Sequence, residues 1–82
     1  MDEYLGVIKL IAGNFCPEGF EYCNGQLLQI NQNQALYSLL GTQYGGDSTH
    51  TFGLPNLNKT LLVPNTTLKY IICTQGLYPT RP

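Results

Sequence analysis

One stretch of the sequence, residues 31–46, is the only segment with a clear helical pattern, and it reads NQNQALYSLLGTQYGG. Its apolar positions recur with a 3.6-residue period, which gathers four side chains on one face of a helix: Ala35, Leu36, Leu39 and Leu40. Asn31 is a good N-cap, Gln34 can complete a capping box with it, and Gly41 can take the left-handed conformation that ends a helix. We therefore expect a short helix over about residues 32–41. Because so short a helix is marginal alone, the rest of the chain must supply the surface that covers its apolar face.

Two segments near the ends of the chain carry the strongest strand pattern. Residues 4–12 (YLGVIKLIA) and residues 68–74 (LKYIICT) are rich in Val, Ile and Leu. Nearly all side chains of residues 4–12 are apolar, so we expect both faces of this strand to be mostly covered. We also expect the two strands to be neighbours in one sheet.

Turn signals divide the remainder into shorter extended pieces. The Asn-Gly pair at positions 24–25 predicts a type I′ hairpin between residues 19–23 and 26–30, because both central residues of that turn need positive φ. After the helix, Phe52 and Leu54 stand two residues apart, which places them on one side of an extended chain. The expected fold is a single α+β domain of mostly short β-strands with one helix packed across them.

Charged residues are scarce, with four basic and five acidic residues among 82. A chain without a basic face lacks the electrostatic footprint for nucleic acid or an anionic membrane surface, so neither is expected as a partner. No run approaches the roughly 18 apolar residues of a membrane span, and the opening MDEYLGVIKLIAG is not a recognisable signal peptide. The polar surface is built instead from Asn, Gln and Thr, a style common in extracellular and fibrous proteins.

No group of residues has the pattern of a catalytic or metal site. A hydrolase or transferase needs a nucleophile with a base, or paired carboxylates in a cleft. The acidic residues here stand at the chain end, in turns or in a short hairpin: Asp2, Glu3, Glu18, Glu21 and Asp47. The single His50 supplies no second imidazole for a metal. We therefore expect no enzymatic activity, no cofactor and no metal ion.

Three cysteines, Cys16, Cys23 and Cys73, leave at least one thiol unpaired within a monomer. Cys16 and Cys23 are spaced to close a small loop, and either could instead meet Cys73. Reduced, partly buried thiols and disulfides within or between subunits both fit the sequence. These alternatives stay open at the level of the sequence.

Four motifs stand in a distinctive order along residues 1–57: the opening LGVIKLIAGNFCPEGF, the turn CNGQLL, the helix INQNQALYSLLGTQYGG and the closing TFGLPNL. Together they resemble the phage tail collar domain, in particular its microcystin-dependent-protein branch. Residues 68–82, LKYIICTQGLYPTRP, resemble the C-terminal strand and tail of that branch. Residues 58–67 would then be a shortened connector that replaces a long middle region. The resemblance implies one collar-like domain over residues 1–82.

The resemblance also implies occurrence in fibrous, self-associating assemblies, and hence an extracellular or virion-associated location. Short tail fibres of this type are trimers that hold metal through histidines and contact the host surface. Because His50 is the one histidine in the sequence, metal binding and receptor recognition are not carried over to this chain.

The leading interpretation is a structural subunit that assembles with copies of itself in a phage-tail-like fibre or an extracellular filament. Low charge, an odd cysteine and more aromatic residues than so small a core can hold all favour it. Strand exchange or edge pairing would join the copies into a trimer or a helical polymer. The expected contact residues are Tyr4, Leu5, Val7, Ile8, Ile11, Tyr70, Ile72, Leu77 and Tyr78, with Cys73 as a candidate staple between subunits.

A second interpretation, from a different class, is a module that binds a surface glycan or a host receptor. Tyr44, His50 and Tyr78, together with the Asn- and Thr-rich loops, would then contact the ligand. This interpretation predicts small oligomers with weak affinity for sugars.

Overall fold

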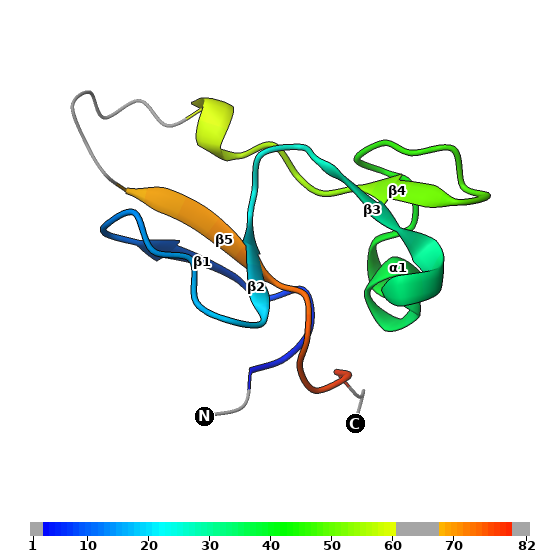
Figure 1. Cartoon of the computed structure of the whole chain (residues 1–82), viewed down its shortest axis with the longest axis horizontal. Helices are drawn as coiled ribbons and strands as arrows, with labels where there is room; N and C mark the ends of the chain where they lie inside the picture. The colour runs from blue at the N-terminus through cyan, green and yellow to red at the C-terminus, as the bar shows by residue number, and fades with distance from the viewer. Residues whose placement is uncertain (1–2, 61–67, 80–82) are drawn as a thin grey trace.

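The computed structural model describes residues 3–60 and 68–79. The elements in these residues are β1 (Ile8–Ile11), β2 (Phe20–Tyr22), β3 (Leu27–Gln29), the 3-10 helix η1 (Ile30–Gln32), α1 (Gln34–Leu40), β4 (Thr51–Gly53), the 3-10 helix η2 (Asn58–Thr60) and β5 (Lys69–Cys73). The strands form two antiparallel sheets, ordered β1-β5-β2 and β3-β4, and α1 lies beside the smaller one (Figure 1). This arrangement confirms the predicted α+β fold of short strands with one helix.

Strand β5 is the centre of the larger sheet. Ile72 stands opposite Ile8 of β1 on one side and opposite Glu21 of β2 on the other. The predicted pairing of the two strongest strands is therefore confirmed. Successive β5 side chains point to opposite faces of the sheet, yet Ile71, Ile72 and Cys73 are all buried. Both faces of this strand are consequently covered.

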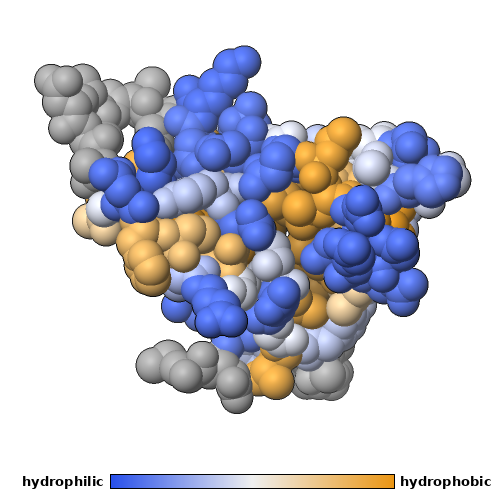
Figure 2. Space-filling view, in the orientation of Figure 1, coloured by the Kyte–Doolittle hydropathy of each residue, from blue (hydrophilic) through white to orange (hydrophobic). Residues whose placement is uncertain are grey.

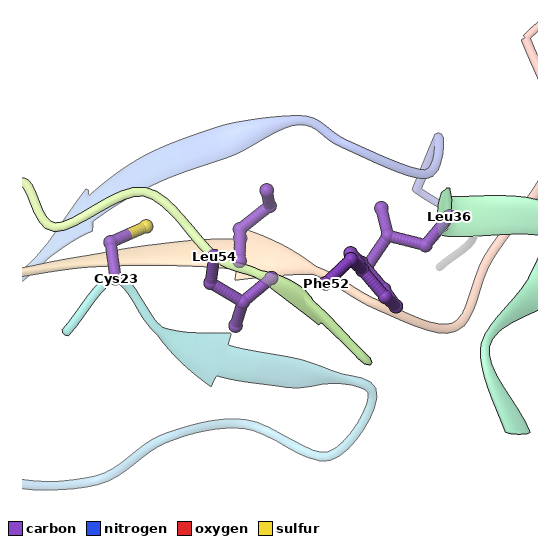
Figure 3. Close-up of a cluster of buried hydrophobic side chains, with 5 residues drawn as sticks. Cys23, Leu36, Phe52 and Leu54 are labelled. Carbon is purple, nitrogen blue, oxygen red and sulfur yellow. The ribbon is translucent and has the colours of Figure 1, made fainter. Parts of the chain in front are cut away.

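The hydrophobic core joins the larger sheet, β4 and α1. Its buried members are Cys23, Leu36, Phe52, Leu54 and Ile72. Figure 3 shows Leu36 of α1 directed toward Phe52 of β4, with Leu54 farther along the same segment. Phe52 also packs against the Tyr37 ring, with the ring centroids 5.4 Å apart. The predicted placement of Phe52 and Leu54 on one side of their segment is confirmed, since both belong to this core.

The helix begins later than the sequence pattern predicts. Its first residue is Gln34, because η1 precedes it and Asn33 takes φ −142° and ψ 42° between the two. Asn33 is the N-cap, and its side-chain amide donates to the carbonyl of Gln29 (3.0 Å) rather than capping α1. The predicted capping box led by Asn31 is therefore wrong. The local turn of η1 uses that residue instead.

The end of the helix agrees with the sequence pattern, and its buried face agrees in part. Gly41 ends α1 with φ 59°, and its N–H bonds back into the last turn. Leu36 is 1% exposed, and Leu39 and Leu40 are half-buried. Ala35 is exposed, so its assignment to the buried face was wrong. The contact with the core is made mainly by one turn of the helix.

The Asn-Gly pair at positions 24–25 does not form the predicted hairpin. The strands on either side belong to different sheets, because β2 pairs with β5 and β3 pairs with β4. Gly25 has φ +80°, as a turn of this kind requires, but its N–H donates to the carbonyl of Pro55 (3.2 Å). Asn24 forms an isolated bridge with Asn56. The pair therefore carries the chain from one sheet to the other.

The strand predicted over residues 4–12 is shorter in the structure. The N–H of Val7 donates to the carbonyl of Tyr4 (3.2 Å), so the chain turns before β1 begins. Tyr4 forms an isolated parallel bridge with Leu77 instead. The expectation that both faces of this segment are mostly covered was wrong, since β1 lies at the edge of its sheet and Leu10 is 48% exposed.

One asparagine side chain ties the start of β5 to the segment between the sheets. The amide nitrogen of Asn58 donates to the Asn24 side chain (2.8 Å) and to the Tyr70 carbonyl (3.2 Å). Its side-chain oxygen accepts the N–H of Tyr70 (2.6 Å). Asn58 thus satisfies the N–H of Tyr70, whereas the Tyr70 carbonyl also accepts the N–H of Cys23 (3.0 Å). It opens the connector predicted over residues 58–67, of which residues 61–67 lie outside the described residues.

The loop before β4 is organised by the carboxylate of Asp47. Its Oδ1 atom accepts hydrogen bonds from the N–H groups of Thr49 (2.9 Å), His50 (2.7 Å) and Thr51 (3.0 Å). These bonds, led by the one from His50, hold the pKa of Asp47 far below its usual range. The His50 imidazole lies 3.9 Å from the other carboxylate oxygen. The loop is therefore held in one conformation, in which Ser48 takes a positive φ of 64°.

Truncation of the helix side chain in the core tests this packing. Leu36→Ala should lower the free energy of unfolding by about 2–5 kcal/mol, because it removes a buried side chain and leaves a cavity. Leu27→Ala is the matched control, since Leu27 is 57% exposed and should cost less than about 1 kcal/mol. Urea unfolding monitored by circular dichroism measures both. Equal effects of the two substitutions would contradict the assigned core.

The Asp47 loop should make stability depend on pH. The pKa of Asp47 is lowered in the folded state, so its contribution is fully present above the unfolded pKa of about 3.9 and is lost as pH falls through the folded pKa. Asp47→Asn should therefore melt at a lower temperature than the unmodified chain at pH 6, and this difference should shrink as pH falls below about 4.

The control is Glu18→Gln, which removes an exposed carboxylate with no side-chain hydrogen bond recorded within residues 3–60 and 68–79. Calorimetric scans from neutral to acid pH give the melting temperatures. A constant difference between Asp47→Asn and the unmodified chain across this range would refute the account of the loop.

Candidate assembly surface

The outer edge of β1 presents main-chain groups to solvent. The N–H of Cys73 donates to the carbonyl of Val7 (2.9 Å), which fixes the phase of the ladder between β1 and β5. Hydrogen-bonded and non-hydrogen-bonded pairs alternate in an antiparallel ladder, so the main-chain groups of Lys9 face β5. Those of Ile8 and Leu10 face away from the sheet. Among the described residues no strand pairs with this edge.

Apolar side chains accompany these outward main-chain groups. Ile8 is 39% exposed and Leu10 is 48% exposed. Both lie on the face of the sheet that carries Ile72, because directly opposite residues share a face and residues two apart do so as well. The core therefore continues to the rim of β1 as exposed apolar surface.

A second exposed apolar region lies where the two ends of the described chain meet. The N–H of Leu5 donates to the carbonyl of Leu77 (2.8 Å), beside the bridge between Tyr4 and Leu77. The Tyr78 hydroxyl shares a hydrogen bond with Ser38 on α1 (2.7 Å). Tyr4, Leu77 and Tyr78 are each about half exposed. Figure 2 shows that apolar surface on the visible face forms separate patches between hydrophilic side chains.

The structure divides the nine contact residues predicted from the sequence into three groups. Tyr4, Ile8, Leu77 and Tyr78 are exposed, whereas Val7, Ile11 and Tyr70 are half-buried. Leu5 and Ile72 are buried, and both pack inside the monomer.

Sequence reasoning missed two exposed apolar residues. Leu10 lies in residues 4–12, whose two faces were both expected to be mostly covered, and Phe15 is absent from the predicted contact residues. Leu10 is 48% exposed and Phe15 is 74% exposed. Turn signals around Phe15 could have indicated exposure. The exposure of Leu10 depends on β1 being an edge strand, which strand propensity does not report.

The charges beside β1 are paired. The Lys9 side chain forms an ion pair with Glu3, and its ammonium lies 5.9 Å from the centroid of the Phe20 ring. The hydrogen bond from Lys9 lowers the pKa of Glu3. Because the positive charge is matched locally, two copies of this edge would meet without strong repulsion from Lys9.

All three cysteines are free thiols in this structure. Cys23 and Cys73 are fully buried, and Cys16 is half-buried. Burial raises the pKa of each thiol, that of Cys23 to about 11. The Cys73 thiol also donates to the carbonyl of Gln75 (3.4 Å). A disulfide staple through Cys73 would therefore require its sulfur to leave the interior.

The residues predicted to contact a glycan do not form one site. The Tyr78 hydroxyl bonds Ser38 of α1, whereas His50 lines a pocket together with Gln34, the first residue of α1. Neither Tyr44 nor Tyr78 lines that pocket. Its other lining residues were missed from the sequence: Gln29, Ile30, Asn31, Gln34, Thr49 and Thr51.

The described residues contain neither a candidate metal cluster nor a candidate membrane-spanning helix. Residues 3–60 and 68–79 hold no cluster of three or more His, Cys, Asp or Glu side chains that could bind a metal ion. In the same residues, no helix has the length and apolar character needed to cross a membrane.

Comparison with known proteins identifies the family of this chain. The sequence model described as Phage Tail Collar Domain matches residues 6–62. No curated protein matches the chain. The matched region contains β1 to β4, α1 and the whole loop organised by Asp47. Because this match covers more than half of the sequence, the chain belongs to the phage tail collar domain family, a structural domain of phage tail fibres.

Proposed function

We propose that this chain is a structural subunit of a tail fibre or similar filament, and that it associates with copies of itself through the outer edge of β1. The observation that carries the proposal is the combination of outward main-chain groups and exposed apolar side chains at Ile8 and Leu10. An unpaired edge of this kind is a template for a strand from another chain. Membership of the collar family supports the structural role and a virion-associated location.

Edge pairing would both bond the outward main-chain groups of β1 and bury its exposed apolar side chains. Each main-chain hydrogen bond formed across the edge contributes about 0.5–1.5 kcal/mol net. Burial of Ile8 and Leu10 would add about 25 cal/mol for each Å² of apolar surface removed from water. The formal net charge of the chain is −1, so repulsion between copies is small.

Pairing at the edge accounts for assembly more simply than strand exchange. β1 and β5 already pair within one chain, so a monomer completes this ladder without a strand from a neighbour. The larger sheet retains open edges at β1 and at β2. Pairing of β1 with β1 would close a two-fold dimer, whereas pairing of β1 with β2 would extend the sheet from copy to copy.

We also propose that the chain belongs to the microcystin-dependent-protein branch of the family. The opening LGVIKLIAGNFCPEGF and the ending LKYIICTQGLYPTRP support this finer assignment. A structural role is consistent with the family, which is not a known family of enzymes.

A lysine at the edge should weaken assembly. Leu10→Lys would place a charge against the apolar rim of the neighbouring copy, and it should raise the dissociation constant by at least about tenfold. Leu27→Lys is the matched control, because Leu27 is similarly exposed but belongs to β3 of the other sheet. Sedimentation velocity over a range of concentrations, with negative-stain microscopy, reports the assemblies. Identical assembly of the unmodified chain and Leu10→Lys would refute the proposal.

Proline substitutions should separate the fold from the assembly. Leu10→Pro removes an N–H that faces outward, so it should reduce assembly while the monomer still melts cooperatively. Lys9→Pro removes an N–H that faces β5 and should lower the melting temperature as well. Calorimetry and sedimentation on both variants make the comparison. Equal melting temperatures for the two variants would contradict the assigned phase of the ladder.

A further inference from the structure

A surface pocket of about 470 Å³ lies between β3, η1, the start of α1 and the loop before β4. Its lining residues are Gln29, Ile30, Asn31, Gln34, Thr49, His50 and Thr51. We propose that this pocket binds a neutral saccharide. The proposed function assigns no ligand to it, and none of its residues belongs to β1.

The chemistry of the lining favours an uncharged polar ligand. Three residues carry amides, two carry hydroxyls and one carries an imidazole, and none is Asp, Glu, Lys or Arg. Amides and hydroxyls both donate and accept hydrogen bonds, as sugar hydroxyls do. Ile30 supplies an apolar surface for the C–H groups of a sugar ring. The volume lies within the range typical of small-ligand pockets.

The amide side chains on one wall are available to a ligand. Gln29, Asn31 and Gln34 make no side-chain hydrogen bond with any other residue that the structure describes. Asn33, which stands between them in the sequence, uses its amide to bond the Gln29 carbonyl (3.0 Å). The amides around the pocket are therefore divided between one that shapes the chain and three that can bond a ligand.

The opposite wall is held in place before any ligand binds. Asp47 accepts three main-chain hydrogen bonds from Thr49, His50 and Thr51, which fixes the loop that carries those lining residues. The N–H of Ile30 donates to the carbonyl of His50 (2.9 Å), so the two walls are joined directly. A site whose walls are already fixed loses less conformational entropy on binding.

The position of the pocket keeps it clear of the proposed assembly edge. Figure 1 places β3 and α1 at the opposite end of the molecule from β1. Copies joined through β1 would therefore leave each pocket open. A filament would then present many copies of a weak sugar site, and multivalency would raise the overall affinity for a glycan-coated surface.

The direct test is a heteronuclear NMR titration of the ¹⁵N-labelled chain with maltose, lactose and di-N-acetylchitobiose, and with sialyllactose as a charged counterpart. At least one neutral sugar should shift the side-chain amide signals of Gln29, Asn31 and Gln34 in a saturable manner. Sialyllactose should bind no more tightly than lactose, because the lining has no Lys or Arg to pair with its carboxylate. Failure of all the neutral sugars at tens of millimolar would overturn the proposal.

Variants locate the binding. The double substitution Asn31→Ala with Gln34→Ala should weaken the sugar by at least about tenfold, which corresponds to about 1.4 kcal/mol. Gln43→Ala is the matched control, because it removes an exposed amide that does not line the pocket. Sedimentation of the double variant should match that of the unmodified chain. Undiminished sugar binding by the double variant would place the site elsewhere and overturn the proposal, whatever the outcome for assembly.

Discussion

The pairing of β5 with a neighbour on each side is the interaction on which the rest of the structure depends. It joins strands that are distant in the sequence, and it delivers Ile72 to the core shared with β4 and α1. Because β5 occupies the centre, β1 and β2 become the edges. So small a domain buries a limited fraction of its surface, and the apolar residues Ile8 and Leu10 remain at one of these edges. The central position of β5 therefore determines both the fold and the edge proposed for assembly.

Much of the fold can be predicted from local sequence, and the exceptions have a common physical reason. The strands rich in Val and Ile, the single helix and the shared side of Phe52 and Leu54 all follow from periodicity. The hairpin at positions 24–25 does not, because the positive φ at Gly25 specifies a turn but not the strands that it joins. The start of α1 was misplaced in the same way, since η1 competes locally for the capping residues.

The candidate sites depend more strongly on long-range geometry. Composition indicates a weakly charged surface with surplus apolar residues, but only the sheet order identifies Leu10 as exposed and Ile72 as buried. The pocket is even harder to predict from the sequence. Its amides come from β3, η1 and α1, and its other wall is placed by Asp47. Among its lining residues, only His50 was named from the sequence as a candidate ligand contact, whereas Asn31 and Gln34 were assigned to capping the helix.

Hydrogen exchange at individual amides of β1 tests the central claim most directly. In dilute solution the amides of Lys9 and Ile11 should be protected by β5, whereas those of Ile8 and Leu10 should exchange rapidly. After assembly at high concentration, the amides of Ile8 and Leu10 should become protected as well. Protection of these two amides in the dilute monomer, or continued rapid exchange within the assembly, would contradict the account.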